Sequence, residues 1–126
     1  MKVLIAEDHP GMSDYLENLF GIWEFEVALA SNGKEAMKML ADDCKEIDLV
    51  VVEQFLPVIP GFRVLQLAKE LRPEIPVFVL TSDWQEKNTA ELKAAGFDWV
   101  FVKPKALAQD FRAAFRVTLP GLELAQ

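Results

Sequence analysis

Five short apolar runs alternate along the chain with longer stretches of helical periodicity. The runs are rich in Val, Ile, Leu and Phe and lie at residues 2–6, 26–30, 47–52, 77–80 and 99–102. After each run, apolar residues recur every three or four positions, which is typical of helices that bury one face. Helices are therefore expected over roughly 12–20, 33–41, 62–71 and 84–95, with a last one around 107–115.

Turn-forming residues predict where these elements begin and end. Pro10 and Gly11 favour a helix start, and Gly21 is expected to cap the end of that helix. Asn32 is a candidate cap for the second helix, and Gly96 for the end of the fourth. The last residues carry Pro120 and Gly121 and are expected to fray. We therefore divide the chain into a domain at residues 1–119 and a tail at residues 120–126.

The order strand, helix, repeated five times, predicts the fold class. Strands that alternate with helices form a parallel sheet covered on both faces. Right-handed crossovers leave few topologies at this chain length. We expect an α/β domain with a doubly wound, five-stranded parallel sheet.

Composition and charge narrow the classes of function. A chain of 126 residues with 52% apolar residues can build one core without disulfides, and its single cysteine fits a cytoplasmic protein. Its first apolar run is too short for a signal segment, and no run has the length expected of a membrane span, so neither is expected. The net charge of −7 argues against direct nucleic-acid binding. Protein partners, metal cations and small ligands remain.

Polar side chains follow four of the five predicted strands. Because the carboxyl ends of parallel strands meet at one edge, these side chains are expected to converge. Clustered carboxylates repel one another, and either a lysine or Mg²⁺ can relieve that repulsion. A hydroxyl and an ammonium beside them could stabilise a phosphoryl group in transfer. The residues are Glu7 and Asp8, Glu53, Thr81 and Ser82, and Lys103.

The ordered set of motifs resembles the receiver domain of bacterial response regulators, the family of the chemotaxis receiver. The resemblance covers nearly the whole chain, from Lys2 to about Val117. No single motif is specific, whereas their order and spacing together are. The matching segments are Glu7-Asp8-His9-Pro10, Asn32-Gly33-Lys34-Glu35-Ala36, Asp48 to Val52, Leu56-Pro57 with Gly61, Thr81-Ser82, Ala95-Gly96 and Lys103-Pro104.

The resemblance implies a flavodoxin-like (βα)5 fold and a signalling role. In this family, an aspartate at the end of the third strand accepts a phosphoryl group from a histidine kinase, and that position is Glu53. The resemblance also implies that Asp8, Glu53 and the Phe55 backbone carbonyl bind Mg²⁺ directly, with Glu7 acting mainly through water.

Two further residues are implied to contact the phosphoryl group. These are Thr81 and Lys103, at the ends of the fourth and fifth strands. In the family the peptide bond between this lysine and the following proline, here Pro104, is typically cis. His9 fits a loop and helix-start role better than a catalytic one.

The chain departs from the family pattern at two positions. Glu53 is one methylene longer than aspartate, and an error of about 1 Å can cost a hundredfold in phosphoryl transfer. Glu53 could also imitate part of the charge of a phosphate, since it carries about one charge where a phosphate carries nearly two. Val100 stands where the family usually has an aromatic side chain that moves inward on activation.

We therefore expect a receiver-like module of two-component (phosphorelay) signal transduction, a degenerate or phosphomimetic receiver that acts through protein contacts. It is not expected to be an enzyme beyond vestigial autophosphorylation and autodephosphorylation. The alternative is a conventional Mg²⁺-dependent phosphoacceptor, and a small hydrolase ranks last. The expected partner is a histidine kinase or a downstream output protein, with a homodimer through the face of the fourth helix, fifth strand and fifth helix as a further expectation. Nucleic acid and membrane are not expected partners.

Overall fold

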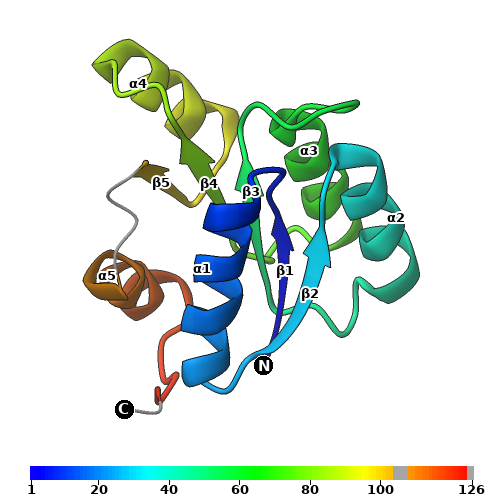
Figure 1. Ribbon diagram of the computed structural model, residues 1–126, viewed down its shortest axis with the longest axis vertical. Helices are drawn as coiled ribbons and strands as arrows, with labels where there is room; N and C mark the ends of the chain where they lie inside the picture. Colours follow the sequence, from blue (N-terminus) through cyan, green and yellow to red (C-terminus); the bar gives the residue numbers. More distant parts are fainter. Residues whose placement is uncertain (104–107, 125–126) are drawn as a thin grey trace.

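The computed structural model describes residues 1–103 and 108–124 and contains five strands and five helices in strict alternation (Figure 1). The elements are β1 (Lys2–Ala6), α1 (Pro10–Ile22), β2 (Glu26–Ala30), α2 (Gly33–Asp43), β3 (Leu49–Glu53), α3 (Gly61–Leu71), β4 (Val77–Thr81), α4 (Glu86–Ala95), β5 (Trp99–Val102) and α5 (Ala108–Thr118).

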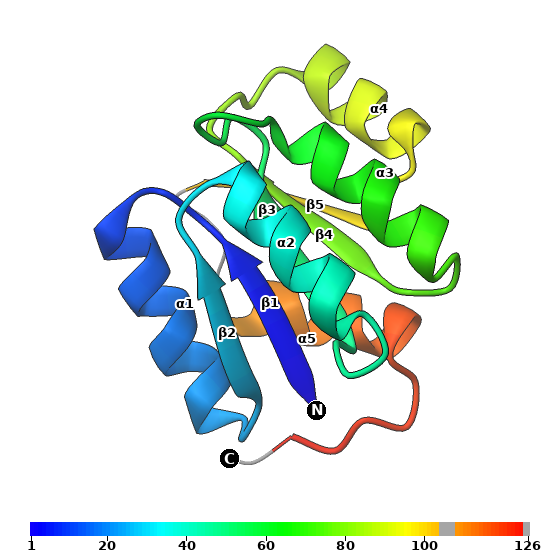
Figure 2. The same cartoon turned by 90° about the vertical axis from the view of Figure 1, so that its right-hand side faces the viewer.

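The strands form one parallel sheet in the order β2-β1-β3-β4-β5. Helices α1 and α5 cover one face, and α2, α3 and α4 lie on the other (Figure 2). This is the flavodoxin-like, doubly wound (βα)5 fold, so the prediction of fold class is confirmed. The central strands β3 and β4 are buried along their whole length.

Alternation along each strand divides the core into two layers. In β3, Val50 and Val52 face the layer under α2 and α3, whereas Leu49 and Val51 face the layer under α1 and α5. Seven aromatic side chains are buried in that second layer, where Phe101 and Phe111 stack with their ring centroids 4.3 Å apart. Phe101, Phe111 and Phe115, near the chain's end, thus belong to the core, whereas Trp84 is exposed.

Some boundaries differ from those expected. Helix α1 runs past Gly21 and ends at Ile22, with Trp23 at the cap position, so the assignment of Gly21 as the cap was wrong. Asn32 does cap α2, because its side chain accepts a hydrogen bond from the Glu35 backbone N–H at 2.8 Å. The expected cis peptide bond to Pro104 lies outside the described residues.

Residues 119–124, which follow α5 and were expected to fray, pack against the core in the structure. Leu119, Leu122 and Leu124 are half-buried and pack against the layer under α1 and α5. Each leucine covers apolar surface at the end of that layer, and this burial holds the segment in place. Elsewhere in the fold, none of the helices among the described residues is long and apolar enough to cross a membrane.

Candidate functional site

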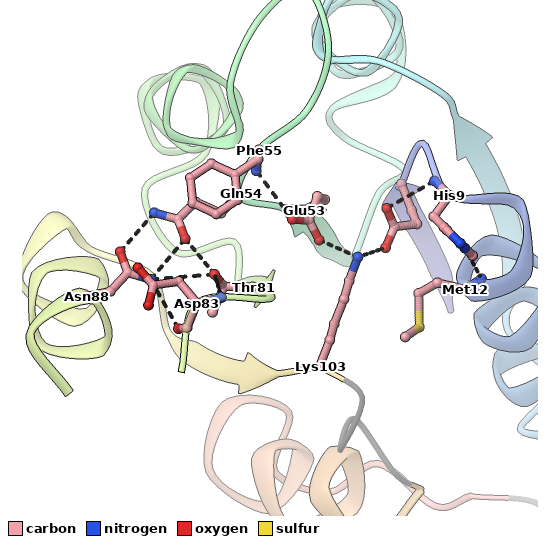
Figure 3. A network of polar contacts seen from close by, with 10 residues as sticks. His9, Met12, Glu53, Gln54, Phe55, Thr81, Asp83, Asn88 and Lys103 are labelled. Carbon is pink, nitrogen blue, oxygen red and sulfur yellow. Dashed lines mark hydrogen bonds and ion pairs between the residues drawn. The ribbon is translucent and has the colours of Figure 1, made fainter. Parts of the chain in front are cut away.

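The carboxyl edge of the sheet carries two separate groups of polar side chains. Because side chains alternate along a strand, Glu53 at the end of β3 follows Leu49 and Val51 to the α1/α5 side. Gln54, one residue later, follows Val50 and Val52 to the other side. Figure 3 shows the two groups, with Glu53 directed to Lys103 and Gln54 directed to Thr81 and Asn88.

The first group is an ionic triad of Glu7, Lys103 and Glu53. The Lys103 Nζ atom lies 2.6 Å from Glu53 Oε2 and also contacts Glu7 Oε1. Both glutamates are buried, with exposed fractions of 3% and 4%. Their two oxygens that face Lys103 have no hydrogen-bond partner elsewhere in the described part of the chain. The ammonium therefore neutralises two carboxylates that would otherwise be buried without a partner.

Burial and charge act in opposite directions on this triad. Burial raises the pKa of Glu7 above its usual 4.5, with the Glu53 charge adding to the rise and Lys103 opposing it. Burial alone would lower the pKa of Lys103, but hydrogen bonds and charges from Glu53 and Glu7 outweigh it and raise the pKa above 10.5. Lys103 is therefore held firmly in its charged form.

The acidic residues expected to hold Mg²⁺ are not gathered around one point. Asp8 is exposed, while Glu7 and Glu53 are buried against Lys103. Within residues 1–103 and 108–124, no group of three or more His, Cys, Asp or Glu side chains could hold a metal ion. In this arrangement the Glu53 carboxylate is paired with Lys103 and Asp8 is exposed, so the residues as placed do not fit Mg²⁺.

The second group centres on Thr81, which is fully buried at the end of β4. Its hydroxyl donates to Gln54 Oε1 at 2.6 Å and accepts from the Asp83 backbone N–H at 3.1 Å. Asn88, in the first turn of α4, contacts both Gln54 and Thr81 with its side-chain amide. The expected site residue Thr81 is thus at the right edge of the sheet, but its hydroxyl is engaged with Gln54 and not with Lys103.

The loop between β3 and α3 is held close to the second helix. A Cβ atom at Gly33 would collide with the Ile59 backbone oxygen, and one at Gly61 would collide with the Glu53 backbone oxygen. Only glycine permits these approaches, which fix the loop that follows Glu53. Val58 at the loop's tip has φ of 70° and is 75% exposed, an uncommon conformation for a β-branched residue.

A pocket of about 400 Å³ opens beside the ionic triad. It lies between the start of α1 and Lys103. His9, at its rim, caps α1 by accepting a hydrogen bond from the Met12 backbone N–H, which supports its expected helix-start role. The lining residues are His9, Gly11, Met12, Tyr15, Ser82 and Lys103.

Comparison with known proteins identifies the family. A model of the response regulator receiver domain matches residues 3–114. The chain belongs to the response regulator receiver domain family. Its relatives include the response regulator SaeR of Staphylococcus epidermidis and of Staphylococcus aureus, each 28% identical over 102 residues, which is 81% of this chain and 43% of the relative. This receiver domain therefore spans less than half the length of those curated relatives.

Solved structures share the same architecture. A receiver domain protein from Clostridium thermocellum matches with a TM-score of 0.84 and 25% identity, over 94% of this receiver domain and 93% of that chain. A chain of the CheX–CheY–BeF3–Mg complex from Borrelia burgdorferi also has a TM-score of 0.84, at 22% identity over 93% and 88% of the two chains. The second likeness shows the fold alone.

Sequence reasoning placed Glu7, Glu53 and Lys103 at one edge of the sheet, but it left open whether Lys103 or Mg²⁺ neutralises the carboxylates, and it missed two residues of the second group. Glu7, Glu53 and Lys103 were each expected from their places at strand ends, and the structure brings them together. Gln54 and Asn88 were not singled out, because 34 residues separate them and only the docking of α4 brings them into contact. The position of Gln54 directly after a strand-end residue was the one available signal.

Proposed function

We propose that this receiver domain is a degenerate or phosphomimetic member of its family, in which Glu53 replaces the phosphoacceptor and signalling proceeds through protein contacts. The single observation that carries the proposal is the 2.6 Å contact between Glu53 Oε2 and Lys103 Nζ. The resemblance assigns Lys103 to the phosphoryl group of a phosphorylated receiver. In this chain the Glu53 carboxylate already binds that ammonium.

The burial of Glu53 supports the same proposal. The residue is 4% exposed, and its carboxylate lies against Lys103 on one side and accepts a long hydrogen bond from the Phe55 backbone N–H at 3.4 Å on the other. A nucleophile in phosphoryl transfer must meet its donor in line and with room for the transferred group. Glu53 would have to leave a buried ion pair to do so, which costs several kcal/mol.

Phosphorylation of the intact protein tests the proposal. The receiver domain, Glu53→Asp and Glu53→Gln are each incubated with acetyl phosphate and Mg²⁺ and then weighed by intact mass spectrometry. We expect no phosphoryl group on the native chain or on Glu53→Gln. Stable addition of a phosphoryl group to Glu53 in the native chain would overturn the proposal.

The second candidate is a conventional Mg²⁺-dependent phosphoacceptor that tolerates glutamate at position 53. The presence of Asp8, Thr81 and Lys103 at the family's positions favours it. In that case Mg²⁺ would use Asp8, Glu53 and the Phe55 carbonyl, with Glu7 through water, and Thr81 and Lys103 would contact the phosphoryl group. Such a site requires Lys103 to release at least one glutamate.

A magnesium titration separates the two candidates, since a bound cation raises thermal stability by mass action. We expect the melting temperature of the native chain to be insensitive to Mg²⁺ and that of Glu53→Asp to rise. An increase for the native chain equal to that of Glu53→Asp would favour the conventional candidate. A matched titration with Ca²⁺ shows whether the response depends on the size of the ion.

Partners belong to the proposal as well. We infer that a histidine kinase or an output protein binds this domain in the cytoplasm without the need for phosphorylation. The net charge of −7 supports a protein partner over nucleic acid. For a homodimer through α4, β5 and α5, the supporting observations are the exposed Val117 and the half-buried Trp99 and Val100. Light scattering across a dilution series tests that dimer.

A further inference from the structure

We propose that Gln54 and Asn88 are positioning residues, which hold the Thr81 hydroxyl on the α4 side of the sheet and tie helix α4 to the end of β3. This inference deepens the proposed function and rests on it for its signalling role, because it names the connection through which the site would act on α4. Four hydrogen bonds among three residues carry it (Figure 3).

The two amide side chains bind each other reciprocally. Gln54 Nε2 donates to Asn88 Oδ1 at 3.0 Å, and Asn88 Nδ2 donates to Gln54 Oε1 at 3.0 Å. Each amide thus offers both a donor and an acceptor to its partner, a geometry that no charged or hydroxyl side chain reproduces. The pair is half-buried, so water competes only partly for these groups.

The Thr81 hydroxyl has no further capacity in this arrangement. A hydroxyl donates one hydrogen bond and accepts two. Thr81 donates to Gln54 Oε1 and accepts from the Asp83 backbone N–H, with a longer contact of 3.4 Å from Asn88 Nδ2. A group bound at Lys103 could therefore gain the Thr81 hydroxyl only by displacing Gln54, which would break up the amide pair.

Helix α4 depends on this pair because its other anchors are few. Leu92 is the only buried side chain of α4, all of whose residues are described, and the helix start at Gln85 has no side-chain cap. Elements with few buried apolar contacts open most readily. On the neighbouring strand β5, the side chain of Val100 offers α4 no polar contact, because it is aliphatic and packs in the layer under α2 and α3. The amide pair is accordingly the polar link between the site and α4.

Amide hydrogen exchange of the unmodified protein, without Mg²⁺ or phosphodonor, tests the anchoring of α4. Asn88→Ala is expected to speed exchange across residues 90–95 by about five- to thirtyfold, as the loss of these hydrogen bonds implies. Helix propensity works in the opposite direction, because alanine is a better helix former than asparagine. Faster exchange in Asn88→Ala therefore reports the lost pair and not the intrinsic preference of the residue.

Controls separate this role from general destabilisation. Gln66→Ala removes an exposed amide from α3 and is expected to leave exchange in α4 unchanged. Exchange in α3 is expected to stay within twofold of the native rate in Asn88→Ala, an order-of-magnitude limit for a local effect. Asn88→Asp keeps the side-chain size and one acceptor but loses the donor, and is expected to fall between Asn88→Ala and the native chain. Unchanged exchange in α4 of Asn88→Ala would overturn the anchoring of α4.

The rotamer of Thr81 provides a readout that a merely structural role would not move. Three-bond couplings of the labelled Thr81 methyl group are expected to report one rotamer in the native chain and in Gln66→Ala. In Gln54→Leu and Asn88→Ala they are expected to report averaging. A single native rotamer in both variants would show that the amides do not position Thr81. Both measurements omit a phosphodonor, so phosphorylation of Glu53 would overturn the proposed function and leave this inference standing.

Discussion

Replacing Lys103 with methionine would remove the ammonium that contacts two buried glutamates. At 2.6 Å and an effective dielectric constant of about 20, the gross attraction between Lys103 Nζ and Glu53 Oε2 is about 6 kcal/mol. Removing one partner of a buried ion pair costs about 3–5 kcal/mol in measured cases. Because the Lys103 side chain is 18% exposed, we take the lower end and expect a loss of about 3 kcal/mol in the free energy of unfolding near neutral pH.

The free energy of unfolding that Lys103→Met loses should depend on pH in a defined direction. The pKa of Glu7 is raised in the folded state, so its protonated form contributes stability that is present below its usual 4.5 and lost as pH rises through the folded value. Without Lys103, that folded pKa should rise further. We therefore expect the deficit of Lys103→Met to be smaller at pH 5 than at pH 8. The raised pKa of Lys103 adds stability to the native chain that is lost only at pH above 10.5.

Urea unfolding followed by circular dichroism at several pH values between 5 and 9 measures both effects. Lys38→Met, which removes an exposed lysine from α2, is the matched control and should stay within about 0.5 kcal/mol of the native chain. Adding Glu7→Gln to Lys103→Met should recover at least about 1 kcal/mol at pH 8, because one unpaired buried charge is gone. The reasoning is refuted if Lys103→Met matches Lys38→Met in both stability and pH dependence.

Three further predictions concern the backbone around the site. Val58→Gly should raise the free energy of unfolding by about 0.5–1 kcal/mol, because relief of the strain at a φ of 70° exceeds the conformational entropy that glycine loses on folding. A lower free energy of unfolding in a urea titration would contradict this. Gly33→Ala should lower the melting temperature, because the new Cβ meets the Ile59 backbone oxygen. Gly21→Ala should raise the melting temperature, because a Cβ there meets nothing and alanine is the better helix former; equal shifts in the two variants would refute the close approach at Gly33. Asn32→Ala should cost about 1 kcal/mol through loss of the α2 cap, with Asn32→Asp close to native as its control; an unchanged Asn32→Ala would rule that cap out.

The sequence by itself determined the order of the elements and the edge at which the site lies. Apolar runs and helical periodicity are local signals, and five strand–helix repeats leave a parallel sheet as the compact solution. Parallel strands bring their carboxyl ends together, so the convergence of Glu7, Glu53, Thr81 and Lys103 on one edge followed from topology alone. The cap at Asn32 was likewise local, since its partner lies three residues away.

Only the tertiary structure decided how those side chains divide. Strand alternation directs Glu53 to Lys103 on one side of the sheet and Gln54 to Thr81 on the other. The docking of α4 then brings Asn88 into contact with Gln54. The sharing of Lys103 by two glutamates, with Asp8 left exposed, is likewise a matter of packing between distant elements. Such contacts have no periodicity in the sequence, because their partners are tens of residues apart and meet only once the core has formed.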